Sequence, residues 1–366
     1  MKLLIFQNAM VQPLDQLRIA ALRFFMKSQW LRQVFSDRAM RLGFNFLILS
    51  GLYLVISLKW SIVLLVLGPL VLGYPHLVAS YRFLQKPNQR LGLRLNSAQV
   101  FRVFVFLTAV SLGIRFIGPL FSFFPEWPYG SWEILLSVVA LGLIKIKLDS
   151  VRNTFAVLLM LLIVGSVLKL AWLYPMVFVG FVLIFHNWVG FGHWFLAAKD
   201  FENRLVVVLA IILFAAIHIF IFKGFFDPWI TFPHFDFLST RSFEASGWVL
   251  ASWSDDPLIW NRMIVIYTFG LSMHYFIWLF AIPQCLEQKA VPNSFRRSLE
   301  QLRNDCGERT SVVLFAVAIG AVGIWIFTAY AGPIYFGLAM LHGWLEFIFL
   351  IAAVFTVMFK VSHEKI

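Results

Sequence analysis

Long apolar segments separated by short polar ones dominate the pattern of this 366-residue chain. A helix needs about 20 apolar residues to cross the hydrocarbon core of a bilayer. The pattern therefore predicts an all-α, polytopic integral membrane bundle of about ten transmembrane helices. The ten apolar segments are residues 42–58, 61–83, 101–124, 133–148, 154–173, 175–197, 205–223, 262–283, 311–330 and 333–359.

The polar stretches between these segments predict how the chain is organised. The shortest separators, Lys59-Trp60 and Ala331-Gly332, predict two tight helical hairpins. One transmembrane domain over 42–359 is expected, between an N-terminal segment (1–41) and a tail (360–366). Within residues 1–41, apolar side chains gather on one face of residues 14–35, as in an amphipathic helix that lies on a membrane surface. The two long connections are 224–261, an aromatic external loop or a lid over an outward-facing cavity, and the cytoplasmic loop 284–310.

Composition and charge agree with a membrane protein. Only 13% of the residues are charged and 61% are hydrophobic, whereas a soluble domain has about 25% charged residues. With the N-terminus inside, 24 of the 30 Lys and Arg residues lie on the cytoplasmic side, which the positive-inside rule favours. Both termini are thus expected in the cytoplasm of a cell with a bacterial-type inner membrane. The net charge of +12 predicts membrane lipids as partners, and no nucleic acid.

Ionisable residues inside the predicted spans are the candidates for chemistry. Such residues are costly in a membrane and usually mark a functional site. Counting about 1.5 Å per residue from the helix ends puts several of them in one layer near the bilayer midplane. Glu346 is the single acidic residue of that layer, and six histidines lie within the predicted spans: His76, His186, His193, His218, His274 and His342.

Spacing along the helices suggests a shared metal site. His186 and His193 are two turns apart, and His342 lies one turn before Glu346, so each pair shares a helix face. Imidazole and carboxylate ligands suit iron, zinc or copper. The alternative for each histidine is a structural hydrogen bond to a neighbouring helix, and we favour simple packing for His218. The predicted metal ligands are His76, His186, His193, His274, His342 and Glu346; Glu346 and Tyr275 are also the candidate catalytic residues.

The segment Gly73-Tyr74-Pro75-His76 resembles the Gly-x-Pro-His signature of the Brp/Blh family of bacterial membrane β-carotene dioxygenases. The resemblance implies a helical bundle in which histidines from several spans hold one non-haem iron beside a hydrophobic tunnel. His76 matches the motif histidine, and His186 with His193 would stand for the later histidine pair. That pair is spaced as His-x-x-x-His in the family, whereas seven residues separate the two histidines here.

The sequence therefore predicts a membrane metalloenzyme, a non-haem iron oxygenase or oxidoreductase that acts on a hydrophobic lipid or isoprenoid. Zinc, copper or haem are alternative cofactors for the same histidines. Two other functions stay open at this point: a haem-binding electron-transfer protein, and a proton-coupled transporter that uses its intramembrane histidines as a relay.

Overall fold

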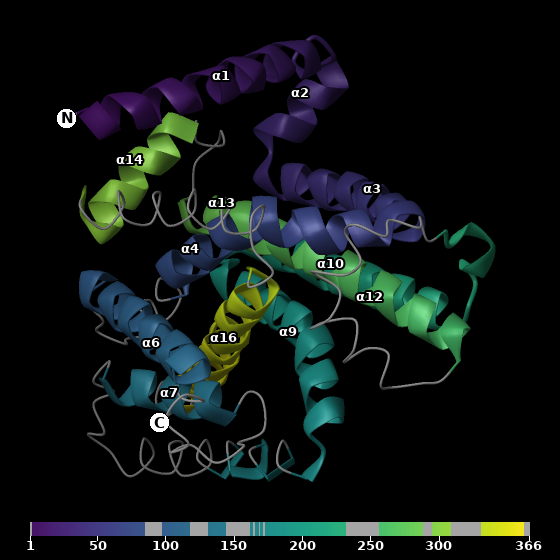
Figure 1. Ribbon diagram of the computed structural model, residues 1–366. Helices are drawn as coiled ribbons and strands as arrows, with labels where there is room; N and C mark the ends of the chain where they lie inside the picture. The colour runs from purple at the N-terminus through teal and green to yellow at the C-terminus, as the bar shows by residue number, and fades with distance from the viewer. Residues whose placement is uncertain are drawn as a thin grey trace.

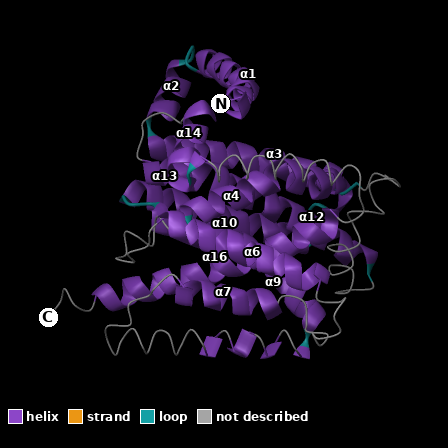
Figure 2. Ribbon diagram, turned by 60° about the vertical axis from the view of Figure 1, so that its left-hand side comes forward, coloured by secondary structure: helices purple, strands orange, loops and turns teal. Residues whose placement is uncertain are grey.

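The computed structural model describes residues 2–84, 97–117, 131–143, 162–163, 165–167, 169–170, 173–231, 256–287, 295–308 and 331–361. Of these residues 92% are helical, and the described part contains no strand (Figure 2). The all-α class is therefore confirmed.

The N-terminal segment forms two helices rather than one. Helix α1 (Lys2–Phe25) and helix α2 (Gln29–Ser36) are separated by a turn, where the side chain of Ser28 caps α2 by accepting a hydrogen bond from the amide of Leu31. The prediction of one amphipathic helix over 14–35 is wrong in this respect, because a serine cap restarts the helix. Helix α1 packs on α14 (Phe295–Cys306), a helix within the stretch that we predicted as a loop (Figure 1).

Helix α3 (Arg38–Leu67) contains the first predicted hairpin. Asp37 begins the helix by accepting a hydrogen bond from the amide of Met40 at 2.7 Å. The backbone of Trp60 has non-helical angles (φ −141°, ψ 44°), so two helices meet there as the sequence predicts. The chain continues through a π-helical segment, η1 (Gly68–Gly73), into α4 (Tyr74–Phe83).

The remaining described helices follow the predicted spans closely. They are α6 (Ser97–Ile117), α7 (Ser131–Leu143), α9 (Pro175–Ala197), α10 (Phe201–Phe222), α12 (Pro257–Phe276), the π-helical η4 (Ile277–Ala281), α13 (Ile282–Glu287) and α16 (Ala331–Val361). The predicted span 311–330, most of 154–173 and the approach to the second hairpin lie outside the described residues.

Helix α12 lies at the centre of the bundle, in contact with α3, α9 and α10 (Figure 1). Within the continuous helical run Leu258–Leu286, 89% of the most apolar window is buried inside the protein, against 22% for Arg38–Ser61 and 33% for Phe201–Phe222. Helix α16 packs against α6, α7 and α9. A side chain on α12 or α16 is therefore well placed to belong to a site enclosed by several helices.

Three helices of the described part are long and apolar enough to cross a bilayer: Arg38–Ser61, Phe201–Phe222 and Leu258–Leu286. The count of ten spans and the orientation with both termini inside stay predictions.

An ion pair fixes the connection that follows α10. Arg262 of α12 donates from two nitrogens to the two carboxylate oxygens of Asp227, in the short helix η3 (Asp227–Trp229). These hydrogen bonds lower the pKa of Asp227. Gly224 adopts φ +81°, and a Cβ atom there would collide with the Arg262 guanidinium. The rest of the predicted external loop, residues 232–255, lies outside the described residues.

Replacing Asp227 by Asn should destabilise the fold by about 1 kcal/mol at neutral pH, because a two-pronged pair at the protein surface contributes about that much. A carboxylate whose pKa is lowered by folding stabilises the protein above its unfolded pKa. Its contribution is lost as the pH falls through the folded pKa, so wild type and Asp227→Asn should converge in strong acid. Thermal unfolding across pH measures this difference. Glu202→Gln, on the exposed start of α10, is the control, and a gap between wild type and Asp227→Asn that stays constant with pH would contradict the prediction.

Candidate metal centre

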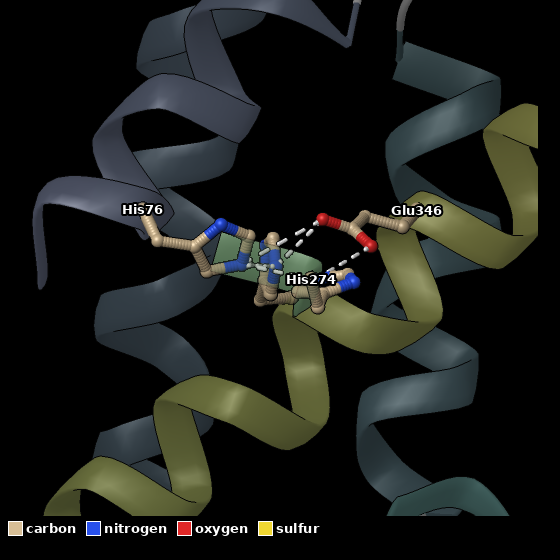
Figure 3. Close-up of side chains that lie close together, drawn as sticks. His76, His274 and Glu346 are labelled. Atoms are coloured by element: carbon tan, nitrogen blue, oxygen red, sulfur yellow. Dashed lines mark hydrogen bonds and ion pairs between the residues drawn. The ribbon is translucent and has the colours of Figure 1, made fainter. Parts of the chain in front are cut away.

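Four buried side chains from three helices converge on one point of the bundle. His76 comes from α4, His274 from α12, and His342 and Glu346 from α16. Each offers one ligand atom, and these four atoms all lie within 4.8 Å of one another. Figure 3 shows the rings of His76 and His274 and the Glu346 carboxylate pointing toward a common centre. The structure thus brings together four of the six predicted ligands.

The nitrogen atoms face one another at close range. Nε2 of His76 lies 2.7 Å from Nε2 of His342 and 3.2 Å from Nε2 of His274. Oε1 of Glu346 is 2.7 Å from His342 Nε2, and its Oε2 is 3.5 Å from His274 Nε2. Both carboxylate oxygens are buried, and neither has a hydrogen bond of acceptable geometry within the described residues. Lone pairs gathered around one point, with a buried carboxylate among them, are what a metal ligand set requires.

The local backbone explains how two of these side chains reach the centre. His76 follows three residues after the π-helical segment η1, and His274 precedes the π-helical segment η4 by three residues. A π-helical turn shifts the register of the residues beside it and occurs frequently at functional sites. Gly190 of α9 lets the His274 ring lie close, because a Cβ there would be only 3.0 Å from His274 Nδ1.

Ser80 fixes which nitrogen of His342 carries the proton. The Ser80 hydroxyl donates to the carbonyl of Leu77 at 3.0 Å, and its oxygen lies 2.9 Å from Nδ1 of His342. Since the single hydroxyl proton is already used, His342 Nδ1–H must be the donor of the second bond. The lone pair of neutral His342 is then on Nε2, the atom that faces the centre. Ser80 therefore directs the His342 lone pair toward the centre, as a metal ligand would need.

His193 lies beside the centre but does not converge on it. Its Nε2 is 2.8 Å from the backbone carbonyl oxygen of Glu346. A carbonyl oxygen only accepts, so Nε2 carries a proton and is not available as a ligand in this arrangement. His193 thus positions the backbone of a ligand-bearing residue instead of offering its own Nε2 to a metal.

His186 stands at the edge of the group. Its ring centroid lies 4.3 Å from that of His274 and 6.3 Å from that of His342, and it is not one of the four converging residues. His218, which we expected to pack, donates from Nδ1 to the carbonyl of Phe214 at 2.8 Å and contacts the Trp188 ring. Sequence spacing put His186 and His193 on one helix face, but it could not show that neither of them is among the four converging residues.

Tyr275 and a small cavity border the centre on one side. The Tyr275 ring is buried, with its centroid 5.3 Å from that of His76. It lines a cavity of about 20 Å³ together with His76, His186 and His342, among apolar side chains. This volume holds one water-sized molecule. A molecule of that size can therefore lie beside His76 and His342.

No protein-family model, curated protein or solved structure matches this chain. The resemblance of residues 73–76 to the Brp/Blh signature therefore stays a prediction.

Replacing Ser80 by Ala should weaken metal binding about 10- to 100-fold, as loss of a residue that orients a histidine ligand typically does. Without Ser80, nothing holds the His342 proton on Nδ1. Competition with a chelator of known affinity measures the effect in purified protein. Ser57→Ala removes a buried hydroxyl from α3 and should leave the affinity unchanged. Equal affinities in wild type and Ser80→Ala would contradict the tautomer assignment.

Proposed function

We propose that this chain is an integral membrane metalloenzyme, a non-haem iron oxidoreductase that oxidises a hydrophobic substrate with dioxygen. The observation that carries the proposal is the buried group of His76, His274, His342 and Glu346, whose ligand atoms lie within 4.8 Å of one another. We further propose that the chain is a multi-pass protein of a bacterial-type inner membrane, on the basis of its apolar helices and the distribution of its Lys and Arg residues.

The number of ligands favours iron over zinc. Catalytic zinc sites have three protein ligands and an open fourth position, and a closed set of four is typical of structural zinc. Three imidazoles and one carboxylate would leave a six-coordinate iron with open positions. The small cavity beside His76 and His342 admits a molecule of the size of water or dioxygen, and such a molecule would lie next to the open positions of the iron. The resemblance of Gly73-Tyr74-Pro75-His76 to an iron-dependent family also favours iron.

Haem is a poor fit to the same histidines. Pockets for cofactors of that size usually have volumes of about 300–1,000 Å³. The cavity that borders the centre measures about 20 Å³. In addition, Nε2 of His76 and Nε2 of His342 face one another at 2.7 Å, which leaves no room for a macrocycle between them.

The protein's own residues would hold, orient and shield the metal. Three neutral imidazoles and the Glu346 carboxylate would offset part of a divalent charge, Ser80 would orient His342, and His193 would hold the backbone of Glu346. The surrounding apolar helices exclude water and favour a substrate that dissolves in the bilayer. Iron bound at these atoms would supply the redox chemistry and the binding of dioxygen.

Purified protein, with any affinity tag removed, should contain about one iron per chain by elemental analysis. His274→Ala and Glu346→Gln should each lower the metal content at least tenfold, because each removes one of four ligands. His218→Ala is the matched control, since it removes a histidine of the same bundle that lies among aromatic rings away from the centre. Wild-type protein that holds less than about one-fifth of an equivalent of any metal after growth in iron-rich medium would contradict the proposal and favour the proton-coupled transporter.

Iron-loaded wild-type protein should consume dioxygen when it is supplied with a bacterial membrane lipid extract, and an oxygen electrode measures this rate. Glu346→Gln should lose at least nine-tenths of the consumption, while His218→Ala should keep it. A metal-loaded wild type that consumes no more dioxygen with the extract than without it would argue against an oxidoreductase, even if the metal site itself is present.

A further inference from the structure

A second and larger cavity lies on the other side of Tyr275, between α3 and the central helix. Its volume is about 190 Å³, and it opens at the protein surface. Because α3 and α12 are both apolar enough to cross a bilayer, that opening faces the hydrophobic surroundings of the bundle. The cavity is lined by Asn45, Leu49, Tyr53, Leu72, Tyr275, Phe276, Leu279 and Phe280.

The volume of this cavity sets the size of a ligand. A protein cavity of about 150 Å³ lined by aliphatic and aromatic side chains binds benzene. The cavity therefore accommodates one six-membered ring with small substituents. A longer apolar tail can extend through the opening into the bilayer.

Two polar groups on one face of α3 set the chemistry of the ligand. Nδ2 of Asn45 donates to the carbonyl of Arg41 at 2.9 Å, which identifies Oδ1 as the atom left to accept a hydrogen bond. In the described part of the chain, neither Asn45 Oδ1 nor the Tyr53 hydroxyl has a hydrogen-bond partner. A half-buried carbonyl oxygen in apolar surroundings favours a ligand that donates a proton to it.

The spacing of these two groups suits a ligand with two polar ends. Asn45 and Tyr53 are eight residues apart, so their Cα atoms are separated by about 12 Å along the helix axis. They share a face with Leu49, one turn from each, and the ring-sized space lies between them. A ring with an oxygen at each of two opposite positions matches such a pair of groups better than a ligand with a single hydroxyl.

Tyr275 connects this cavity to the metal centre. It lines both cavities, and its ring lies beside the ring of His76. Gly68, at the start of η1, lies beside the Tyr275 ring, since a Cβ there would be in ordinary van der Waals contact with Tyr275 Cε2 at 3.6 Å. The π-helical segments η1 and η4 supply Leu72, Leu279 and Phe280 to the wall of the larger cavity. The segments that shape the centre therefore also shape the larger cavity.

We propose that the larger cavity binds the ring of a membrane-soluble para-hydroquinone and that this hydroquinone is the substrate of the metal centre. One hydroxyl donates to Asn45 Oδ1, and the opposite oxygen forms a hydrogen bond with Tyr53. The inference rests on the proposed function for its reaction. In that reaction two hydroquinones give up four electrons and four protons and become two quinones, while one dioxygen accepts them and becomes two waters. The Asn45 acceptor favours the reduced ligand, because a quinone has no proton to donate.

Binding is tested without metal or turnover, using chelator-treated protein in lipid nanodiscs under argon. Hydroquinone and p-xylene are the probes, because they differ only by the replacement of two hydroxyls by two methyls. Titration calorimetry, with protein-free nanodiscs as the blank, should show that hydroquinone binds the protein at least tenfold more tightly than p-xylene does. Asn45→Leu and Tyr53→Phe should each reduce this preference about three- to tenfold and leave p-xylene binding nearly unchanged.

Cavity-filling variants locate the binding. Leu49→Trp should abolish binding of both probes, and Leu52→Trp, on the exposed face of the same helix, should bind them as the wild type does. Equal affinity of the wild type for the two probes, or unchanged binding by Leu49→Trp, would overturn the proposal. Because the assay uses metal-free protein, it tests the hydroquinone proposal separately from the metalloenzyme proposal. If His274→Ala loses its metal but wild-type protein does not bind hydroquinone, the metalloenzyme proposal is supported and only the hydroquinone substrate is excluded.

Discussion

A carboxylate buried at the centre of an apolar helical bundle is the constraint on which the rest of the structure depends. Transferring an ionised carboxylate from water to such surroundings costs many kcal/mol unless a partner of opposite charge is close. The nearest polar atoms to Glu346 are the Nε2 nitrogens of His342 and His274. Ser80 makes neutral His342 present a lone pair there rather than a proton, so it does not compensate the carboxylate. A bound cation meets the requirement, since it interacts favourably with the carboxylate and the imidazole lone pairs together.

The central helix and its neighbours bring the histidines close to this carboxylate. Helix α12 contacts α3, α9 and α10, and His274 is fully buried among them. Helix α16 supplies two ligands one turn apart, and α4 adds His76 just after a π-helical segment. The same two π-helical segments border the cavity that contains Asn45 and Tyr53. If the centre binds a metal and the larger cavity binds the proposed substrate, the two binding events would be coupled through the backbone of these segments, and a change in η1 or η4 should affect both.

Much of the fold follows from hydropathy alone, because each span must present an apolar surface over about 20 residues. The bounds of α9 and α10 agree with prediction to within a few residues, and the break at Trp60 follows from a two-residue polar separator. Hydropathy did not predict the separation of α1 from α2, because a serine cap is a local hydrogen bond that hydropathy does not report. Depth along each helix put His76, His186, His274 and Glu346 in one layer, with His193 below it and His342 above it. It could not show that His342 joins the converging group and that His186 does not, since depth and periodicity give the face of one helix but not the atom that meets it from the next. Ser80 lies one turn after His76 on the same face, and this spacing is the signal that could have identified it.

X-ray absorption at the metal edge reports on the atoms that bind the metal. In metal-loaded wild-type protein, we predict a shell of nitrogen and oxygen atoms at about 2.0–2.2 Å, with outer scattering from three imidazole rings and no sulfur. His274→Ala should lose the scattering of one ring, and His193→Ala should keep all three. A spectrum dominated by sulfur, or a His274→Ala spectrum identical to that of wild type, would contradict the account.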